Sequence, residues 1–292
     1  MSSEIQLPPN VAVDVCQDLT GKVKYNSDIY KSRATGGMAD VFEGDYNGRT
    51  VAVKVIRIFE PDKIQDYRRR FVREAKAWTQ LSSSEHTNVL QFIGVMNWQS
   101  NRPALISLFQ KNGTVLEYIA KNEQADRHCL VLGVASGLQY IHEEGAVHGD
   151  LKSNNVLIDD CERPLISDFG QSRLVGDADY TTYTMRKQNR MYTAPEIFIA
   201  QDEDLDIDAF SLTTAEADVY TFSITAFEIL HGTRYLFRYR NIPKAVVERG
   251  VRPPEGVISE CYFALLVQCW EAEPSNRLRI NDVVQELGKM RQ

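Results

Sequence analysis

The sequence lacks the features that mark membrane, secreted and metal-stapled proteins. No apolar run reaches the ~18 residues that a membrane-spanning helix needs. The opening residues MSSEIQLPPN have no basic stretch followed by an apolar one, as a secretory signal would. The five cysteines are scattered without a C-x-x-C pair, which argues against a zinc site or a disulfide framework. We therefore expect a cytoplasmic protein with no membrane segment.

An excess of positive charge is also missing. Lys and Arg number 33 against 40 Asp and Glu, which gives a net charge of −7 and argues against a nucleic-acid partner. The composition is otherwise that of a globular protein, with 43% hydrophobic and 25% charged residues. A chain of 292 residues can form one large two-lobed unit or two small domains.

The N-terminal third is rich in strand signals. Residues 1–28 carry a Pro-Pro pair and little periodicity, so we interpret them as an N-terminal extension outside the core. Between Tyr30 and Phe59, runs of Val, Ile, Phe and Tyr are interrupted by Asn47-Gly48, a hairpin signal, and predict three antiparallel strands. Two further strands are predicted near residues 92–98 and 104–109.

Helical spacing first occurs between these two groups of strands. Ile64, Phe71 and Trp78 recur on one helix face, and Arg68–Arg70 are expected to cover the other side. The second half of the chain is mainly helical, and residues 217–230 are apolar nearly all round, which predicts a helix buried on every side.

These patterns predict an α+β fold with two lobes. The smaller, antiparallel β-rich lobe with one helix is expected over residues 29–107, and the larger α-rich lobe over residues 108–292. A hinge is expected near Leu108–Asn112. Two lobes with a cleft between them are a common setting for a ligand site.

One lysine and one glutamate are predicted to pair inside the smaller lobe. A lone lysine in a strand is usually a solvated edge charge. Lys54, in RTVAVKVI, differs because Glu74 lies beside the apolar stripe of the following helix and is directed inward. A buried carboxylate needs a cation, and Lys54 is well placed to supply one.

The stretch VHGDLKSNNVLIDD holds three polar side chains in what reads as a loop before a strand. Asp150, Lys152 and Asn155 lie at the spacing of the H-R-D-L-x-x-x-N catalytic loop of protein kinases, which this stretch resembles. Asp168 follows in LISDFG, directly after an apolar run. The oxygens of Asp168 and Asn155 are ligands suited to Mg²⁺.

The joint order and spacing of these motifs resemble a eukaryotic protein kinase domain of the tyrosine-kinase-like branch, from roughly Tyr30 to Met290. DLTGKV together with HGDLKSNN is similar to fungal members. Further matches are Ala194-Pro195-Glu196, Asp218, Trp270 and Arg277. The resemblance implies a two-lobed protein kinase-like fold, ATP and Mg²⁺ as cofactors, and a protein substrate.

The resemblance also implies a role for each matching residue. Asp150 would accept the proton of the acceptor hydroxyl, and Lys152 is typical of serine/threonine kinases. Lys54, held by Glu74, would contact the phosphates of ATP. Metal ligands would be Asn155 and Asp168, and the remaining nucleotide contacts would come from Gly36, Val41, Ala52, Leu108, Phe109, Gln110 and Leu157, with Ser107 as gatekeeper. Asp218 would brace the catalytic-loop backbone, His148 would pack on Phe169, and Arg277 would pair with Glu196.

The sequence departs from the family pattern at a few positions. Ala34 and Ala39 replace two glycines of the glycine-rich loop, which weakens the match to a phosphate-binding loop. Asn189 stands where serine/threonine kinases carry a threonine. Gly149 replaces the arginine that precedes the catalytic aspartate, which we interpret as a change of regulation, and we expect a Gly149→Arg variant to fold.

Three functions remain open at this point. We favour an ATP-dependent protein kinase that acts on serine and threonine rather than tyrosine hydroxyls. The alternative is a pseudokinase with weak or no transfer, used as a nucleotide-binding scaffold or switch. A phosphotransferase for small molecules is disfavoured, because Asp218, Trp270, Arg277 and the Ala-Pro-Glu element fit kinases of protein substrates. Nothing in the pattern specifies an oligomeric state.

Overall fold

Two units make up the chain in a computed structural model. They comprise Met1–Glu85 with Leu90–Gln110, and His86–Val89 with Lys111–Gln292. The structure describes residues 16–25, 34–35, 39–57, 64–99, 102–174, 192–202, 212–234 and 255–290. No helix within these ranges is both long enough and apolar enough to cross a membrane.

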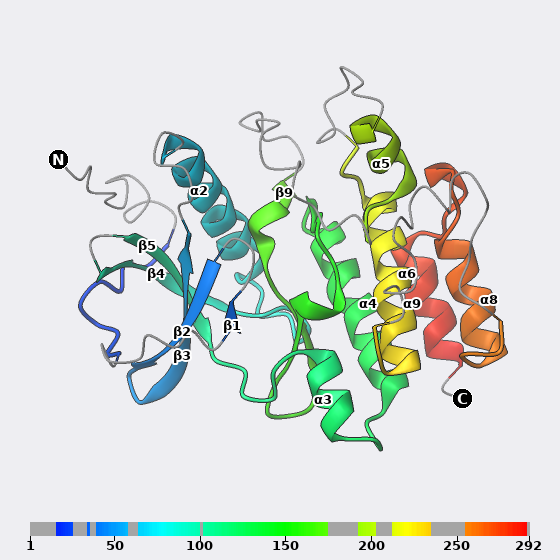
Figure 1. Cartoon of the computed structure of the whole chain (residues 1–292), viewed down its shortest axis with the longest axis horizontal. Coiled ribbons are helices and arrows are strands. Elements are labelled where there is room, and N and C mark those ends of the chain that lie inside the picture. Colours follow the sequence, from blue (N-terminus) through cyan, green and yellow to red (C-terminus); the bar gives the residue numbers. More distant parts are fainter. Residues whose placement is uncertain are drawn as a thin grey trace. The chain divides into compact units, whose positions relative to one another are not determined.

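The first unit is built on a five-stranded antiparallel sheet with the strand order β1-β2-β3-β5-β4 (Figure 1). The strands are β1 (Ala34–Thr35), β2 (Ala39–Tyr46), β3 (Arg49–Ile56), β4 (Phe92–Trp98) and β5 (Arg102–Leu108). The turn between β2 and β3 places Asn47 and Gly48 at φ values of 53° and 76°, as a tight hairpin requires. The predicted hairpin and the two later strands are confirmed.

Helix α2 (Ile64–Leu81) packs against this sheet. Its apolar stripe buries Phe71 and Trp78, as predicted. The expectation that the arginine run covers the opposite side is wrong for Arg70, whose residue surface is only 8% exposed. Arg70 precedes Glu74 by four residues, so both lie on one face of the helix.

The other face of the sheet carries an apolar cluster. Along β3, Val51, Val53 and Val55 point to this face, because successive side chains of a strand alternate. The buried members of the cluster are Leu19, Val23, Val51, Val53, Val55, Met96, Trp98, Ala104 and Ile106. Lys54 therefore points to the side of α2, away from this cluster.

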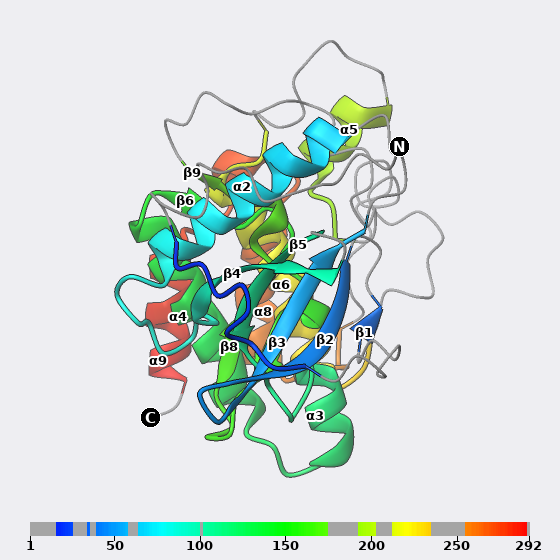
Figure 2. The ribbon, with the colours of Figure 1, turned by 90° about the vertical axis from the view of Figure 1, so that its left-hand side faces the viewer.

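Residues 16–25 cross this apolar face from one side of the sheet to the other, and we call them the strap. At one end, the Leu19 amide donates to the Val95 carbonyl at 2.7 Å, along the outer edge of β4. At the other end, Lys24 and Asp45 of β2 exchange backbone hydrogen bonds of 2.8 and 2.7 Å. Figure 2 shows the strap as a dark-blue trace in front of the strands.

The strap corrects one prediction. Residues 1–28 were expected to lie outside the core, yet Leu19 is 0% and Val23 is 5% exposed. Burying one such side chain stabilises a fold by about 1.5–3 kcal/mol. The strap also pairs the free edge of β4, which would otherwise present unpaired backbone groups. Leu19 and Val23 of the strap therefore belong to the first unit's core.

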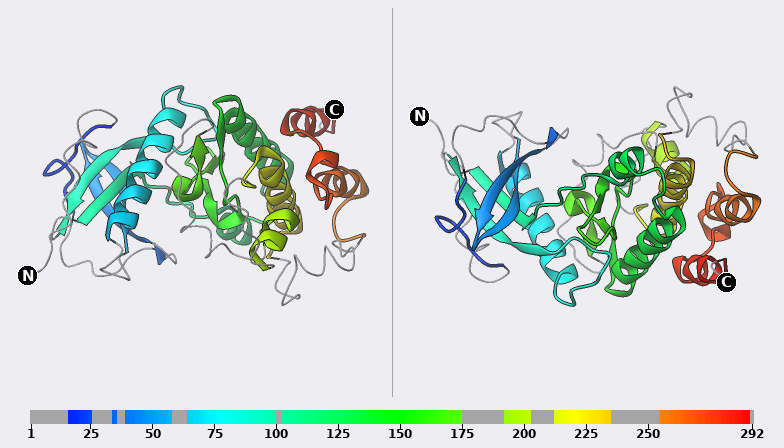
Figure 3. Two further views of the ribbon diagram at one scale, coloured as in Figure 1. Left: turned by 90° about the horizontal axis from the view of Figure 1, so that it is seen from above. Right: turned by 90° about the horizontal axis from the view of Figure 1, so that it is seen from below.

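The second unit is mainly helical (Figure 3). Its helices are α3 (Val115–Lys121), α4 (Arg127–Glu143), α5 (Pro195–Asp202), α6 (Ala215–His231), α8 (Glu260–Cys269) and α9 (Ile280–Lys289). Short strands β6 (Ala146–Val147) and β9 (Arg173–Leu174) pair with each other, as do β7 (Val156–Ile158) and β8 (Pro164–Ile166). Helix α4 contacts both α6 and α9.

Helix α6 is the centre of this unit. Every residue from Ala217 to Ile229 is buried, which confirms the prediction of a helix enclosed on all sides. The helix begins at Thr214, whose hydroxyl accepts the Ala217 amide, and ends at Gly232 in the left-handed conformation.

We predict that Gly94→Ala will loosen the strap. A methyl group at position 94 would lie 2.3 Å from the Gln17 carbonyl oxygen and 3.2 Å from Leu19, so the strap must move. We expect the free energy of unfolding to fall by about 1–3 kcal/mol in urea titrations. Gly288→Ala, in α9, is the matched control, because no atom in the described part of the chain lies within 4 Å of the added methyl. It should stabilise by up to ~1 kcal/mol. Equal stability changes in the two variants would show that the strap does not depend on Gly94.

Candidate active site

The first unit holds the predicted ion pair. Lys54 Nζ on β3 lies 2.6 Å from Glu74 Oε1 on α2, which confirms the pairing. The Glu74 side chain is 1% exposed, whereas that of Lys54 is 18% exposed. The second carboxylate oxygen, Glu74 Oε2, is buried and has no hydrogen-bond partner among the described residues.

The predicted nucleotide contacts of the first unit share the sheet face of Lys54. The strand register pairs Val41 with Lys54, and Ala52 with Ser107. Directly opposed side chains point to the same face, so these four lie together on it. Leu108 ends β5, and Phe109 and Gln110 follow directly. Predicted positions Gly36 and Asn189 lie outside the described residues.

The second unit groups the polar residues of the loop between β6 and β7. Lys152 Nζ lies 2.5 Å from Asp150 Oδ2. The Asn155 side-chain amide donates to the Asp150 backbone carbonyl at 2.8 Å and to Asp150 Oδ2 at 3.3 Å. The Asp150 carboxylate is therefore fixed through one of its two oxygens.

Asp168 lies close enough to this group to act on its charge. It follows β8, at a left-handed φ of 68°. The preceding Ser167 donates through its hydroxyl and its amide to the Asn155 carbonyl, at 3.0 and 2.8 Å. Burial raises the pKa of the Asp150 carboxyl. Lys152 opposes that rise and the charge of Asp168 adds to it. Leu157, the remaining predicted site residue, lies half-buried in β7.

The loop backbone is anchored by a buried carboxylate. Asp218, at the start of α6, accepts the backbone amides of His148 at 2.7 Å and Gly149 at 2.8 Å, and lies 2.9 Å from His142 Nε2. Three hydrogen bonds compensate the burial of this charge. The predicted bracing role of Asp218 is confirmed.

His148 is held in one tautomer. Its Nδ1 accepts the Asp150 amide at 3.2 Å, so the ring proton is on Nε2, which donates to the Ser167 carbonyl at 3.1 Å. Its ring meets that of Phe169 edge-on at 5.4 Å, which confirms the predicted packing. His148 therefore links the loop to the segment that carries Asp168.

The pairing predicted between Arg277 and Glu196 is also confirmed. The guanidinium donates to both carboxylate oxygens of Glu196, at 2.8 and 2.7 Å. It also donates to the backbone carbonyls of Glu271 and Glu216. This fork holds the start of α5 against the loop before α9.

Gly149 has a conformation that other residues adopt poorly. Its φ is +77°, and an added Cβ would lie 2.6 Å from the Gln171 carbonyl oxygen. The expectation that Gly149→Arg leaves the fold intact is therefore not supported, because any side chain here meets rigid backbone. Gly149 is therefore needed for its backbone conformation and for the space that its missing side chain leaves.

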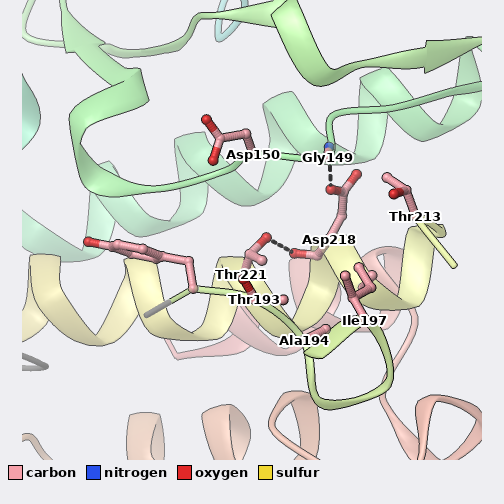
Figure 4. Close-up of a pocket in the computed structure, with 10 residues that line it drawn as sticks. Gly149, Asp150, Thr193, Ala194, Ile197, Thr213, Asp218 and Thr221 are labelled. Carbon is pink, nitrogen blue, oxygen red and sulfur yellow. Dashed lines mark hydrogen bonds between the residues drawn. The ribbon is translucent and has the colours of Figure 1, made fainter. Parts of the chain in front are cut away.

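A small pocket opens beside Gly149 and Asp150 (Figure 4). Its volume is about 320 Å³, part of which is open to solvent. The lining residues are Gly149, Asp150, Tyr192, Thr193, Ala194, Ile197, Thr213, Ala217, Asp218 and Thr221. Among these described residues, the charged side chains are the carboxylates of Asp150 and Asp218.

Sequence reasoning missed a buried network below the loop. The Tyr192 hydroxyl donates to Glu228 Oε2 at 2.7 Å and lies 3.5 Å from the Ser153 hydroxyl. Glu228 is 0% exposed. The available signal was a single carboxylate in the otherwise uncharged run VYTFSITAFEIL, within a helix predicted to be buried all round.

We predict that Gly149→Ala will destabilise the protein more than Gly145→Ala. Both positions have positive φ, at 77° and 70°, so each variant bears the cost of a left-handed alanine, about 1–2 kcal/mol. Only Gly149 adds a clash with Gln171, since no atom of the described residues lies within 4 Å of a methyl at position 145. Thermal unfolding of both variants measures the difference. Equal losses would mean that the loop yields freely at Gly149.

We predict that the stability of Glu228→Gln, measured against that of wild type at the same pH, will increase as the pH rises. Burial raises the pKa of this carboxyl. The folded state therefore holds the proton more tightly than the unfolded state. Stability then falls as the pH climbs from the ordinary carboxyl range through the folded pKa. Glutamine removes this dependence. Unfolding midpoints at pH 5 and pH 8 should show the larger gain at pH 8, and a constant difference would contradict the assignment.

Comparison with known proteins agrees with this geometry. The family model described as "Protein tyrosine and serine/threonine kinase" matches residues 28–287. The chain is 29% identical over 271 residues to "Serine/threonine/tyrosine-protein kinase HT1" of Arabidopsis thaliana, which covers 88% of the chain and 64% of that protein. It is 25% identical to "Serine/threonine-protein kinase STY46" of the same plant, over 97% of the chain and 46% of the relative.

A receptor kinase is also similar. "Ephrin type-A receptor 5" of Gallus gallus is 28% identical over 82% of the chain, and the match spans 23% of the receptor. The chain thus spans from about a quarter to two thirds of the length of these relatives. Since the family model covers almost the whole chain, the chain belongs to the protein tyrosine and serine/threonine kinase family.

Proposed function

We propose that the chain is a protein kinase that transfers the γ-phosphoryl group of Mg-ATP to serine and threonine hydroxyls of protein substrates. The observation that carries this proposal is the geometry around Asp150, whose carboxylate is held by Lys152 and Asn155. Catalysis of phosphoryl transfer depends on positioning and charge rather than on covalent chemistry, so such a fixed carboxylate is the part that the reaction needs.

Asp150 would receive the proton of the acceptor hydroxyl. The hydrogen bonds from Lys152 and Asn155 go to Oδ2, so Oδ1 is the oxygen that would face the hydroxyl. Burial raises the pKa of the carboxyl, which makes it a better base than an exposed aspartate. Lys152 would keep the carboxylate oriented and balance its charge before transfer.

Asn155 and Asp168 would bind a magnesium ion, and Lys54 would bind phosphate groups of ATP. Asn155 and Asp168 present oxygen ligands of the kind that Mg²⁺ prefers, and the Asn155 nitrogen is already used by Asp150. Bound Mg²⁺ would neutralise the charge that develops on the transferring group. Lys54, oriented by Glu74, would hold the remaining phosphates, while Val41 and Ala52 of the same sheet face would contact the adenine.

Serine and threonine are the proposed acceptors because of Lys152. It lies beside the catalytic carboxylate, as the resemblance to serine/threonine kinases implies. The names of the Arabidopsis relatives include both serine/threonine and serine/threonine/tyrosine kinases. Analysis of the phosphorylated amino acids therefore belongs to the test.

We predict that Asp150→Asn will lower the rate of phosphate transfer and spare nucleotide binding. Loss of a general base costs ~10²–10⁴-fold in rate. The measurement is transfer of labelled phosphate from Mg-ATP to a basic protein, with acid hydrolysis to separate phosphoserine, phosphothreonine and phosphotyrosine. Binding is followed by thermal shift, in which ligand at 100 times Kd stabilises by about 2.7 kcal/mol.

The matched control is Asp160→Asn, the same change at a side chain that is 71% exposed. It should transfer phosphate at the wild-type rate. Binding of Mg-ATP by the wild-type chain without any transfer would instead assign it to the pseudokinase scaffolds. Transfer by Asp150→Asn at the wild-type rate would remove Asp150 from the role of base.

A further inference from the structure

A short connector joins the two units of the chain. It consists of residues 109–114, and the division between the units falls within it. On the side of the first unit, the Phe109 amide donates to the Thr50 carbonyl of β3 at 3.1 Å. On the side of the second unit, the Gly113 carbonyl accepts the amide of Ile158, the last residue of β7, at 3.0 Å. Each end of the connector is therefore bonded to a strand.

Asn112 adds a side-chain bond to this connection. Its Nδ2 donates to the backbone carbonyl of Asp159 at 2.7 Å, across 47 positions of the sequence. Asn112 is half-buried, so water competes less for this bond than at the surface. The adjacent ion pair between Lys111 and Asp160 joins the same two segments, but its side chains are 69% and 71% exposed. An ion pair so exposed contributes little, and Asn112 is therefore the stronger of these two side-chain links.

The carbonyl that accepts this bond belongs to a well-fixed turn between β7 and β8. The side chain of Asp159 is only 12% exposed. Its Oδ1 accepts the backbone amides of Cys161 and Arg163 at 2.9 and 2.8 Å, and its Oδ2 accepts Arg163 Nε at 2.8 Å. The Asp159 carbonyl also accepts the Glu162 amide at 3.1 Å. The turn is thus held by its own hydrogen bonds, and Asn112 ties the connector to it.

The Asn112 bond lies between residues that are predicted to contact the nucleotide. Gln110, in the connector, comes two residues before Asn112. Leu157, in β7, comes two residues before Asp159. Further along the connector, Thr114 forms an isolated bridge with Leu157. The bond therefore sets the spacing between the connector backbone and the strand that carries Leu157.

We propose that Asn112 is a positioning residue for the nucleotide, because its bond to the Asp159 carbonyl holds the connector at a fixed distance from Leu157. This role rests on the proposed function, since it takes Gln110 and Leu157 as contacts of ATP. Without the bond, the connector has to be ordered when the nucleotide binds, and this ordering lowers the affinity. The loss is the same before and during phosphoryl transfer, because the adenine end of ATP does not react. KM for ATP should rise while kcat stays the same.

The first test compares Asn112→Ala with Asn122→Ala. Asn122, at the end of α3 in the same unit, also donates its side-chain amide to a backbone carbonyl, that of Tyr118 at 2.9 Å. Both variants lose one bond of the same kind, so a purely structural effect should appear in both. We expect Asn112→Ala to raise KM for Mg-ATP about 3–10-fold, the range that one hydrogen bond supports, with kcat within about twofold of wild type.

Asn122→Ala should keep the wild-type KM. An unchanged KM in Asn112→Ala, or an equal rise in both variants, would overturn the proposal. A fall in kcat without a change in KM would do the same, because Asn112 would then act on the transfer step.

The second test needs no nucleotide. Hydrogen exchange of the Ile158 amide reports on the connector, because its acceptor is the Gly113 carbonyl next to Asn112. We expect this exchange to be at least about threefold faster in Asn112→Ala than in wild type, and unchanged in Asn122→Ala. Equal exchange in wild type and Asn112→Ala would show that the connector does not depend on this side chain.

The two tests separate the role of Asn112 from the proposed function. Faster exchange in Asn112→Ala, in a protein whose wild type binds no Mg-ATP, would keep the link between the connector and β7 and remove the kinase function. Transfer of phosphate by wild type and Asn112→Ala with the same KM would keep the kinase function and remove Asn112 from nucleotide positioning.

Discussion

The buried carboxylate of Asp218 is the interaction on which the loop that carries Asp150 depends. It holds the amides of His148 and Gly149, and thereby sets where the following Asp150 begins. The charge can remain buried because three donors surround it, His142 among them. Removing any of these donors would leave part of a charge without compensation in the centre of the helical unit.

In the first unit, a buried carboxylate also holds a polar partner, because Glu74 binds Lys54. Lys54 is paired with Glu74 on a sheet whose opposite face is apolar. Alternation along β3 separates the two tasks, since Val53 and Val55 pack under the strap while Lys54 faces α2. The strap therefore stabilises the strand from behind, and Glu74 orients the lysine from the front. Of these two contacts, the one between Lys54 and Glu74 was visible in the sequence motifs, and the one made by the strap was not.

The sequence was informative wherever a periodic pattern was long. The hairpin at Asn47-Gly48, the wholly buried helix α6 and the Lys54–Glu74 pair were all predicted correctly. The strap was missed because ten residues that cross strands at an angle have no strand or helix period. The placement of Arg70 was missed because three consecutive arginines do not reveal which one faces inward.

Two local conformations were also beyond reach from sequence. Gly149 has a positive φ and lies close to the Gln171 carbonyl oxygen. These two residues are far apart in the sequence, so no local pattern reveals that they meet. The Tyr192–Glu228 bond likewise joins residues of different elements. Such features follow from tertiary packing, which composition and spacing do not encode directly.

The strap has a practical consequence for the expression of the region that the family model matches. The family match begins at residue 28, three residues after the strap ends. A recombinant fragment cut at that boundary would leave Val51, Trp98 and the rim of β4 uncovered. Such a fragment is expected to aggregate through the unpaired strand edge and the exposed apolar face. Its low solubility would then result from the missing strap and not from the rest of the protein.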